Sequence, residues 1–299
     1  MKAIQFSRFG GPEVLELVEL DDPHPAEGQI RIAVRAAGVN PIDWKVRSGE
    51  MGGDVPRQTG VEVAGVVDEL GDGVTDIAVG DHVFGSVAGG AAELALSGFY
   101  APMPESLDFV EAAALPVAAE TAVRTLDLLG VGEGQTLLIN GASGSVGVAA
   151  TQLARERGAR VIGTASPANH EYIRSFGAEP TTYGDGLVDR VRELAPDGVD
   201  RALDAAGGAA LPALVQLTGA ADRVVTIADY QGAEETGVRF TGGMGTERAW
   251  TALRDAAALI EAGRFSVPVA ETFPLAQIAE AHRISETGHP RGKLVLTVG

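Results

Sequence analysis

Apolar and polar residues alternate with period two in short segments of the first 110 residues. Residues 30–34 read I-R-I-A-V and alternate strictly, and residues 61–67 read V-E-V-A-G-V-V and alternate less cleanly. Glycine and proline surround these segments, for example at 10–12 and 71–73. Short strands that are separated by turns at this spacing predict a small barrel or sandwich.

From about residue 111 the pattern changes to alternating strands and helices. Apolar segments predict strands at 136–140, 160–164, 180–183, 199–205 and 223–228. Helical patterns cover 111–115, 118–129, 145–157, 169–176, 187–194 and 209–217. Buried strands that alternate with helices predict an α/β fold with a parallel, doubly wound sheet of the Rossmann type.

The C-terminal part changes pattern again. It predicts a long helix at 247–262, an extended segment at 268–273, a helix near 276–287 and a strand at 293–298. Because an isolated last strand needs a sheet to join, we expect it to return to the β-rich part of the chain. The predicted domains are therefore 1–112 with 266–299, and 113–265.

Composition and charge narrow the functional classes. The chain has 299 residues, no cysteine and a formal charge of −18 that is spread along the sequence. The missing cysteines exclude disulfides, cysteine nucleophiles and thiolate zinc sites. The charge disfavours nucleic-acid binding, because such a surface repels phosphate backbones. The first residues lack a signal peptide's apolar core and no window approaches ~18 apolar residues, so we expect a cytoplasmic protein without membrane association.

A glycine-rich turn links the strand at 136–140 to the helix at 145–157. The turn reads G-A-S-G-S-V-G at 141–147, with Ala142 where the G-x-G-x-x-G pattern has its first glycine. Gly144 would let the backbone approach a pyrophosphate, and Gly147 would let the helix pack closely on the strand. The helix start offers N–H groups and a positive dipole end to phosphates. The predicted dinucleotide contacts here are Gly141, Ser143, Gly144, Ser145 and Val146.

The end of the next strand favours NADPH over NADH. NAD sites usually carry Asp or Glu there for the ribose 2′-hydroxyl. Ser166 stands at this position and the first acid is Glu171. A carboxylate would repel a 2′-phosphate, whereas a hydroxyl can donate to it. Further predicted cofactor contacts are Thr164, His170, Arg174 and Tyr183, each of which taken alone is also typical of a surface or packing residue.

Six motifs in order resemble the medium-chain dehydrogenase/reductase superfamily, in its zinc-independent branch of quinone oxidoreductases (zeta-crystallin-like) and alkenal/oxoene reductases. They are A-A-G-V-N-P-I-D-W-K-V-R-S-G (36–49), T-G-V-E-V-A-G-V-V (59–67), V-G-D-H-V-F-G (79–85), L-P-V-A-A-E-T-A (115–122), N-G-A-S-G-S-V-G (140–147) and G-K-L-V-L (292–296). The resemblance covers nearly the whole chain. It implies a GroES-like catalytic domain, built from both chain ends, around the Rossmann domain, with the active site in the cleft between them.

Zinc-dependent members of this superfamily carry a Cys near position 40 and Gly-His-Glu where this chain has 60–62. Asn40 and Val61 replace those ligand types here, and Glu62 and His82 alone do not make a tetrahedral site. We therefore expect chemistry without a metal. A quinone or an α,β-unsaturated carbonyl is already electrophilic, so its reduction needs positioning of the hydride donor and hydrogen bonds to the developing oxyanion.

The resemblance places the catalytic candidates in N-P-I-D-W-K. Asn40 and Lys45 would lie near the nicotinamide ribose and the substrate carbonyl, and Asp43 would orient them. Quinone reductases of this branch often have Tyr near the Lys45 position, so Lys45 favours enals and enones. An exposed loop lysine at 45 and a capping or turn residue at 43 are the alternatives.

Several other side chains are candidates for the site. Ile227 and Ala228 end the predicted parallel strand at 223–228, and ligands bind at the carboxyl ends of such strands, so both are predicted beside the nicotinamide. By resemblance, Thr121 lies near the cofactor. The predicted walls of the substrate pocket, which are equally typical of plain core residues, are Trp44, Phe84 and Phe240.

The leading hypothesis is an NADPH-dependent reductase of small electrophilic substrates. A 2-enoyl-thioester reductase shares the fold but would need a basic patch for its carrier, and the sequence shows none. A third alternative is a non-catalytic, crystallin-like NADPH-binding protein. The resemblance also implies a homodimer that pairs through an edge strand near 238–241.

Overall fold

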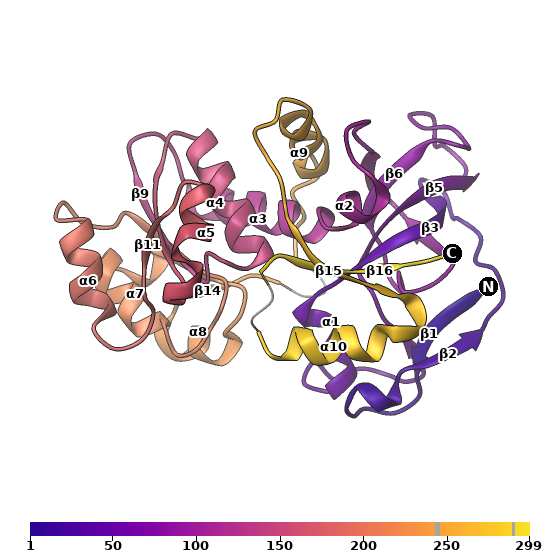
Figure 1. Ribbon diagram of the computed structural model, residues 1–299, viewed down its shortest axis with the longest axis horizontal. Coiled ribbons are helices and arrows are strands. Elements are labelled where there is room, and N and C mark those ends of the chain that lie inside the picture. The colour runs from indigo at the N-terminus through magenta and orange to yellow at the C-terminus, as the bar shows by residue number, and fades with distance from the viewer. Residues whose placement is uncertain (243–245, 289–290) are drawn as a thin grey trace. The chain divides into compact units, whose positions relative to one another are not determined.

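The computed structural model describes residues 1–242, 246–288 and 291–299, and it divides into two compact units. The first unit contains 1–117 and 250–299, so it holds both the indigo N-terminal and the yellow C-terminal parts of the chain in Figure 1. The second unit contains 118–249. The sequence placed the boundaries after 112 and after 265.

The first unit is built on a mixed β-sheet, in which β15 and β16 pair parallel and the other neighbouring strands pair antiparallel. Its strands run in the order β15-β16-β3-β5-β6-β8, with β7 also paired to β3, and a smaller sheet has the order β2-β1-β4. The bounds are β1 Lys2–Phe6, β2 Glu16–Glu19, β3 Ile30–Val39, β4 Arg57–Gln58, β5 Glu62–Leu70, β6 His82–Ser86, β7 Leu94–Ser97, β8 Phe99–Pro102, β15 Val269–Pro274 and β16 Lys293–Thr297. The C-terminal strand β16 pairs with β3, so the predicted return of the chain to this sheet is confirmed.

Helices and short 3-10 turns surround this sheet. They are η1 Pro12–Val14, α1 Pro41–Ser48, α2 Phe109–Ala113, α9 Ala252–Glu261, η4 Leu275–Gln277 and α10 Ile278–Glu286. The second boundary lies before residue 250 and not after 265, because α9 and the residues before it pack on the first unit. Arg254 forms an ion pair with Asp76, and Trp250 packs edge-on against Phe99.

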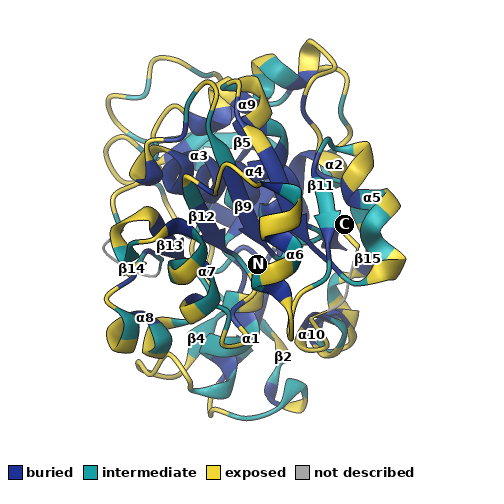
Figure 2. Cartoon of the chain, turned by 90° about the vertical axis from the view of Figure 1, so that its left-hand side faces the viewer, coloured by how far each residue is buried: buried dark blue, intermediate teal, exposed yellow. Residues whose placement is uncertain are grey.

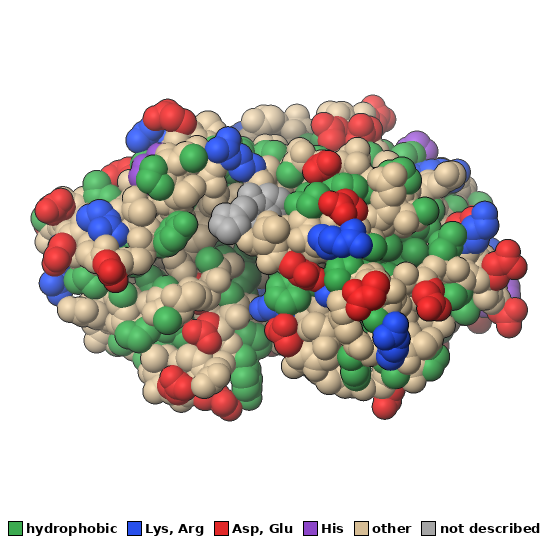
Figure 3. All heavy atoms as spheres, turned by 60° about the horizontal axis from the view of Figure 1, so that its bottom comes forward, with side chains coloured by type: hydrophobic (Ala, Val, Ile, Leu, Met, Phe, Trp, Pro, Cys, Tyr) green, Lys and Arg blue, Asp and Glu red, His purple; other side chains and the backbone are tan. Residues whose placement is uncertain are grey.

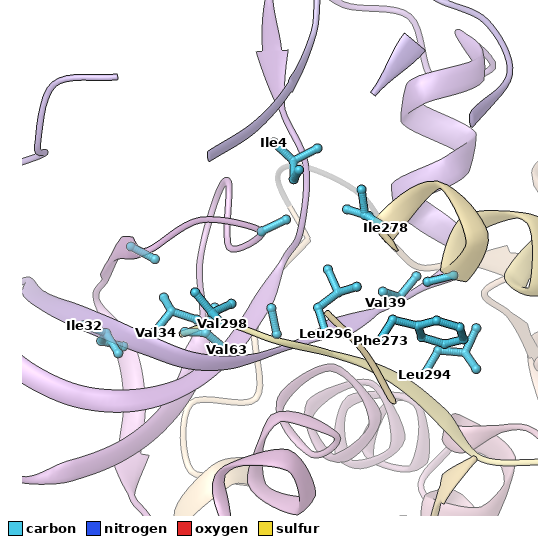
Figure 4. Close-up of a cluster of buried hydrophobic side chains, with 14 of the residues drawn as sticks. Ile4, Ile32, Val34, Val39, Val63, Phe273, Ile278, Leu294, Leu296 and Val298 are labelled. Atoms are coloured by element: carbon cyan, nitrogen blue, oxygen red, sulfur yellow. The ribbon is translucent and has the colours of Figure 1, made fainter. Parts of the chain in front are cut away.

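Apolar side chains from both ends of the chain form the core of the first unit. Figure 4 shows Ile4, Val39, Phe273 and Leu296 within one cluster, which also contains Val63. Burying a side chain of this size contributes roughly 1.5–3 kcal/mol, so the cluster binds the C-terminal strand firmly to the N-terminal ones.

The second unit is a parallel sheet in the order β11-β10-β9-β12-β13-β14. Numbered within the unit, this is the 3-2-1-4-5-6 order of a Rossmann fold, with the order reversing between β9 and β12. The strands are β9 Thr136–Asn140, β10 Arg160–Thr164, β11 Glu179–Thr181, β12 Arg201–Asp204, β13 Val224–Thr226 and β14 Arg239–Phe240. The predicted doubly wound sheet is confirmed.

Helices cover this sheet and expose their outer faces, whereas strands such as β9 and β12 are dark blue in Figure 2. They are α3 Pro116–Leu129, which begins in the first unit, α4 Ser145–Glu156, α5 His170–Ser175, α6 Leu187–Leu194, α7 Leu211–Thr218 and α8 Tyr230–Thr236, with 3-10 turns η2 Pro167–Asn169 and η3 Ala221–Arg223. The sequence did not predict α1 or α8, and it began the helix at 247–262 five residues too early.

Acidic residues are spread over the surface, as they are along the sequence. On the face drawn in Figure 3, acidic side chains are scattered and do not gather in one patch. Among the described residues, no helix has the length and apolar character that crossing a membrane requires.

Candidate functional site

The glycine-rich turn leaves the carboxyl end of β9 beside the point where the strand order reverses. Gly141 has φ +86°, and a Cβ on it would lie 2.7 Å from the Cβ of Ala206. A Cβ on Gly147 would lie 2.2 Å from the Gly141 carbonyl oxygen. A side chain on Gly141 would collide with the segment after β12, whereas one on Gly147 would push α4 away from the turn, which is the close packing that the sequence assigned to Gly147.

Gly144 is different, because a side chain there would meet no close neighbour. It is the N-cap of α4, and a Cβ there would have no neighbour nearer than 3.7 Å. The first N–H groups of a helix lack intrahelical acceptors, and they lie at the positive end of its dipole. Ser143, Ser145 and Val146 are half-buried around this start. Unshielded backbone donors at a switch point fit the diphosphate of a dinucleotide.

Thr164 supports the turn from the neighbouring strand. Its hydroxyl donates to Asn140 Oδ1 at 2.7 Å and accepts from the Gly141 N–H at 3.0 Å. The side chain is fully buried. Within the described residues Thr164 supports Gly141, and its contact with a cofactor stays a prediction.

The residues predicted at the 2′-phosphate lie after β10 and along α5. Ser166 is half-buried at the start of η2, and a His170 ring nitrogen lies 3.3 Å from the Ala165 carbonyl oxygen. Arg174 is half-exposed and forms an ion pair with Glu171. Tyr183 is also half-exposed. Ser166 thus lies two residues after the end of β10, in the region where an acid would discriminate against a phosphate.

In the first unit, the sequence-predicted Asn40 belongs to a buried ionic cluster. Asn40 directly follows β3, and its Nδ2 donates to Glu62 Oε1 at 2.7 Å. The Lys293 ammonium donates to Asn40 Oδ1 at 2.6 Å and lies 2.6 Å from Glu62 Oε1. The other Glu62 oxygen accepts from the Val117 N–H at 2.7 Å. The amide of Asn40 is therefore held in one orientation by a carboxylate and an ammonium.

Gly38 makes room for this cluster, since a Cβ on it would lie 2.2 Å from Glu62 Oε1. Glu62 has no exposed surface and Lys293 is 2% exposed. A buried charge needs a partner, and each of these two neutralises the other.

Asp43 stabilises the start of α1. Its carboxylate accepts from the N–H of Asn40 at 2.8 Å and from the N–H of Gly60 at 3.1 Å. Burial raises the pKa of Asp43 to about 7; the hydrogen bond from Asn40 opposes this, and the nearby Glu62 adds to it. The capping role that the sequence left open for Asp43 is the one these contacts describe.

Lys45 lies on the helix and not in a loop. It is half-buried, and its ammonium lies 5.8 Å from the ring centroid of Trp44, within range of a cation–π contact. Trp44 is half-buried as well, and its Nε1 is buried without a hydrogen-bond partner within the described residues.

The remaining predicted residues are distributed over both units. Phe84 is fully buried in β6, which leaves no exposed ring for a ligand. Phe240 lies on the edge strand β14 and packs edge-on against Tyr230. Thr121 is buried in α3 and accepts from Arg124 at 3.4 Å. Ile227 and Ala228 follow β13 directly, whereas the sequence predicted them as the last two residues of that strand.

The described residues include no group of three or more His, Cys, Asp or Glu side chains that could hold a metal ion. The two remaining ligand types are used otherwise. Glu62 is paired with Lys293, and His82 is exposed and packs on the ring of Phe109. A metal ion at Glu62 would have to displace a buried ammonium, so the donor set does not fit a metal.

Sequence reasoning missed Lys293 and Asp204. Lys293 stands at the start of an otherwise apolar last strand, and Asp204 at the end of the buried strand β12. A charged residue in a strand that is buried on both faces is the signal that would have identified them.

The comparisons with known proteins agree with this architecture. Residues 26–108 match the family model "Alcohol dehydrogenase GroES-like domain", and residues 176–296 match "Zinc-binding dehydrogenase". Quinone oxidoreductase from Rattus norvegicus is 34% identical over 99% of this chain and 97% of its own length. The polyketide synthase system protein NorB from Streptomyces orinoci is 37% identical over 97% of this chain, but the chain spans only 14% of that protein.

Solved structures give the same result. The quinone oxidoreductase from Coxiella burnetii has a TM-score of 0.85 and 31% identity, with 100% of this chain and 99% of that chain covered. A mycobacterial protein complexed with NADPH has a TM-score of 0.87 and 29% identity over the full length of both chains. The CurK enoyl reductase, at 22% identity and a TM-score of 0.87 over 100% of this chain and 99% of that chain, shares the fold.

Proposed function

Since the chain belongs to the quinone oxidoreductase family of the medium-chain dehydrogenase/reductase superfamily, we propose that it transfers hydride from NADPH to a quinone or an α,β-unsaturated carbonyl without a metal ion. The observation that carries the proposal is the cluster of Asn40, Glu62 and Lys293. A lysine ammonium satisfies the carboxylate that would otherwise be available to a cation. An acceptor that is already electrophilic needs no Lewis acid.

The second unit would hold NADPH. When bound, the cofactor supplies a hydride from its nicotinamide ring. The open backbone at Gly144 and the first N–H groups of α4 would bind the diphosphate, with Ser143 and Ser145 beside them. Ser166 would donate to the 2′-phosphate, assisted by His170, Arg174 and Tyr183. The similar mycobacterial protein that is complexed with NADPH supports this cofactor.

The first unit would supply donors for the developing oxyanion. A primary amide carries two N–H groups, and Asn40 donates one of them to Glu62. The second N–H would serve the nicotinamide ribose or the substrate oxygen. The Lys45 ammonium, held over Trp44, would provide positive charge for the same oxygen. By resemblance, a lysine at this position, where quinone reductases of this branch often have Tyr, favours enals and enones as substrates.

A substrate panel tests the proposal. NADPH oxidation is measured with 1,4-benzoquinone, 9,10-phenanthrenequinone, acrolein, 3-buten-2-one and crotonyl-CoA, and each assay is repeated with NADH. Turnover of an enal, enone or quinone with a preference for NADPH is expected. Silence across the panel while NADPH still binds would support the non-catalytic alternative. A Lys45→Ala variant with undiminished turnover would remove Lys45 from the catalytic residues.

One observation favours a second candidate, a 2-enoyl-thioester reductase. The chain is similar to a segment of the polyketide synthase protein NorB. Preferred turnover of crotonyl-CoA in the same panel would identify this activity.

The resemblance also supports a homodimer. Strand β14 lies at the edge of the sheet in the second unit, so its outer backbone groups are available to a second copy. Analytical ultracentrifugation of the protein and of a Phe240→Pro variant tests this. Pairing through β14 predicts a dimer that the variant weakens, since proline removes a backbone donor.

A further inference from the structure

The carboxyl ends of four neighbouring strands in the second unit carry buried polar side chains. Asn140 ends β9, Thr164 ends β10, Asp204 ends β12 and Thr226 ends β13. Asn140 is 4% exposed and the other three are fully buried. The same edge of the sheet bears the glycine-rich turn and Ile227-Ala228.

Asp204 is the centre of one hydrogen-bond network that joins these side chains. Its Oδ1 accepts from Asn140 Nδ2 and the Gly207 N–H, both at 2.8 Å, and from the Ala206 N–H at 3.2 Å. Its Oδ2 accepts from the Thr226 hydroxyl at 2.7 Å. Four donors therefore satisfy a fully buried carboxylate.

One branch of the network leads to the glycine-rich turn. The Oδ1 of Asp204 accepts from two backbone N–H groups and therefore acts as an acceptor, so Asn140 must direct its Nδ2 to Asp204 and its Oδ1 to Thr164. Thr164 then has to donate to Asn140, which leaves its oxygen lone pairs for the Gly141 N–H. The acceptor character of Asp204 thus fixes the position of the first residue of the turn.

A second branch leads to the segment after β13. Thr226 donates its hydroxyl proton to Asp204, so its oxygen accepts from the N–H groups of Ala228 and Asp229, both at 3.1 Å. Asp229 in turn caps α8 by accepting from the Gly232 N–H at 2.8 Å. The backbone at Ile227-Ala228 is therefore held by the same carboxylate that holds Gly141.

We propose that Asp204 is a positioning residue for the dinucleotide, which holds the diphosphate turn through Asn140 and Thr164 and the nicotinamide segment through Thr226. This inference rests on the proposed function, because it takes the glycine-rich turn and Ile227-Ala228 as the two ends of the NADPH site. The hydrogen-bond partners of Asp204 are Asn140, Ala206, Gly207 and Thr226, so it would act on the cofactor through them. It fixes the donor and acceptor directions of the hydrogen bonds that link Asn140 and Thr164 to Gly141 and Thr226 to Ala228.

Threonine substitutions test the two branches separately. Thr→Val keeps the shape and removes the hydroxyl, whereas Thr→Ser keeps the hydroxyl and removes a methyl group. The ligands are NADPH and 2′-phospho-ADP-ribose, which has the diphosphate but no nicotinamide. Dissociation constants come from calorimetry, and the emission of bound NADPH reports on the surroundings of the nicotinamide.

Thr164→Val is expected to weaken both ligands about tenfold, because it releases the diphosphate turn. Thr226→Val is expected to weaken NADPH about tenfold and to shift its bound emission, while 2′-phospho-ADP-ribose stays within about twofold. Thr164→Ser and Thr226→Ser are expected to bind both ligands within about twofold of wild type. Asp204→Asn, where it folds, is expected to weaken both ligands by more than either valine variant.

The possible results separate the two proposals. Valine variants that bind like wild type, or serine variants that fail as the valine variants do, would overturn the positioning role alone and leave the proposed function standing. A wild-type protein that binds neither ligand would overturn the proposed function together with this inference.

Discussion

Each unit of this protein buries a carboxylate without exposed surface, Glu62 in the first and Asp204 in the second. In both cases an asparagine donates to it, Asn40 directly after β3 and Asn140 as the last residue of β9. The other partners differ. Glu62 faces the Lys293 ammonium, whereas Asp204 is surrounded by the neutral donors of Thr226, Ala206 and Gly207. The first carboxylate depends on one opposite charge, and the second on several hydrogen bonds.

The helices that follow the two asparagines differ in a related way. At α1, the Asp43 carboxylate accepts from Asn40 and thereby occupies the helix start. At α4, the N-cap is Gly144 and offers no side chain. The start of α1 is therefore capped by a side chain of its own segment, whereas the start of α4 has no side-chain cap and leaves its N–H groups to an external anion.

The largest expected effect comes from removing the charge partner of Glu62. Lys293→Met should lower the free energy of unfolding by about 3–5 kcal/mol, because it leaves a buried carboxylate unpaired. Chemical denaturation measures the loss. The double variant Glu62→Gln, Lys293→Met is the matched control and should recover most of it. A single variant as stable as wild type would show that Glu62 does not need the ammonium.

The capped start of α1 should make stability depend on pH. The pKa of Asp43 is about 7 in the folded protein against 3.8 ordinarily, so its stabilising contribution is complete below pH 4 and is lost as the pH rises through 7. Asp43→Asn removes this dependence. Relative to wild type, the variant should therefore gain about 2–4 kcal/mol between pH 4 and pH 8, measured by denaturation at each pH.

The wild-type profile alone would mislead, because His282 acts in the opposite direction. Burial lowers the pKa of His282 to about 3, with Arg47 adding to the shift, so its contribution is present above pH 6.5 and is lost as the pH falls. His282 contributes equally to both proteins, so subtracting the wild-type free energy of unfolding from that of Asp43→Asn at each pH removes its contribution. A difference that does not change with pH would contradict the raised pKa of Asp43.

Asp204→Asn should cost less than Lys293→Met. The amide keeps one acceptor oxygen and loses part of the hydrogen bonding, so about 1–3 kcal/mol of stability should be lost. The same denaturation experiment measures it. A loss equal to that of Lys293→Met would remove the distinction between the ionic cluster and the hydrogen-bonded one.

The smallest expected effect concerns the preference of the proposed cofactor site for NADPH over NADH. Ser166→Asp should weaken NADPH about tenfold or more and leave NADH nearly unchanged, because the new carboxylate repels the 2′-phosphate. Fluorescence titration with both cofactors measures it, with Ser166→Asn as the uncharged control. An Asp variant that still prefers NADPH would place the 2′-phosphate elsewhere.

Local patterns predicted much of the second unit. Strands β9 and β10 lie where the sequence placed them, since a buried strand that runs through glycines into a helix is recognisable from neighbouring residues. The signals of α1 were also local. Asn40, Pro41 and Asp43 are typical of the first turn of a helix, but the sequence left a capping or turn role for Asp43 as an alternative and predicted no helix there.

The sequence by itself therefore determined the alternation of strands and helices, the open helix start at Gly144 and the hydroxyl at Ser166. Only the tertiary structure decided the partners of the buried charges. Lys293 is 253 residues from Asn40, and Asp204 is 64 residues from Asn140. Periodicity indicates which face of an element is buried, whereas the partner of a buried charge depends on which strands lie side by side in the folded sheet.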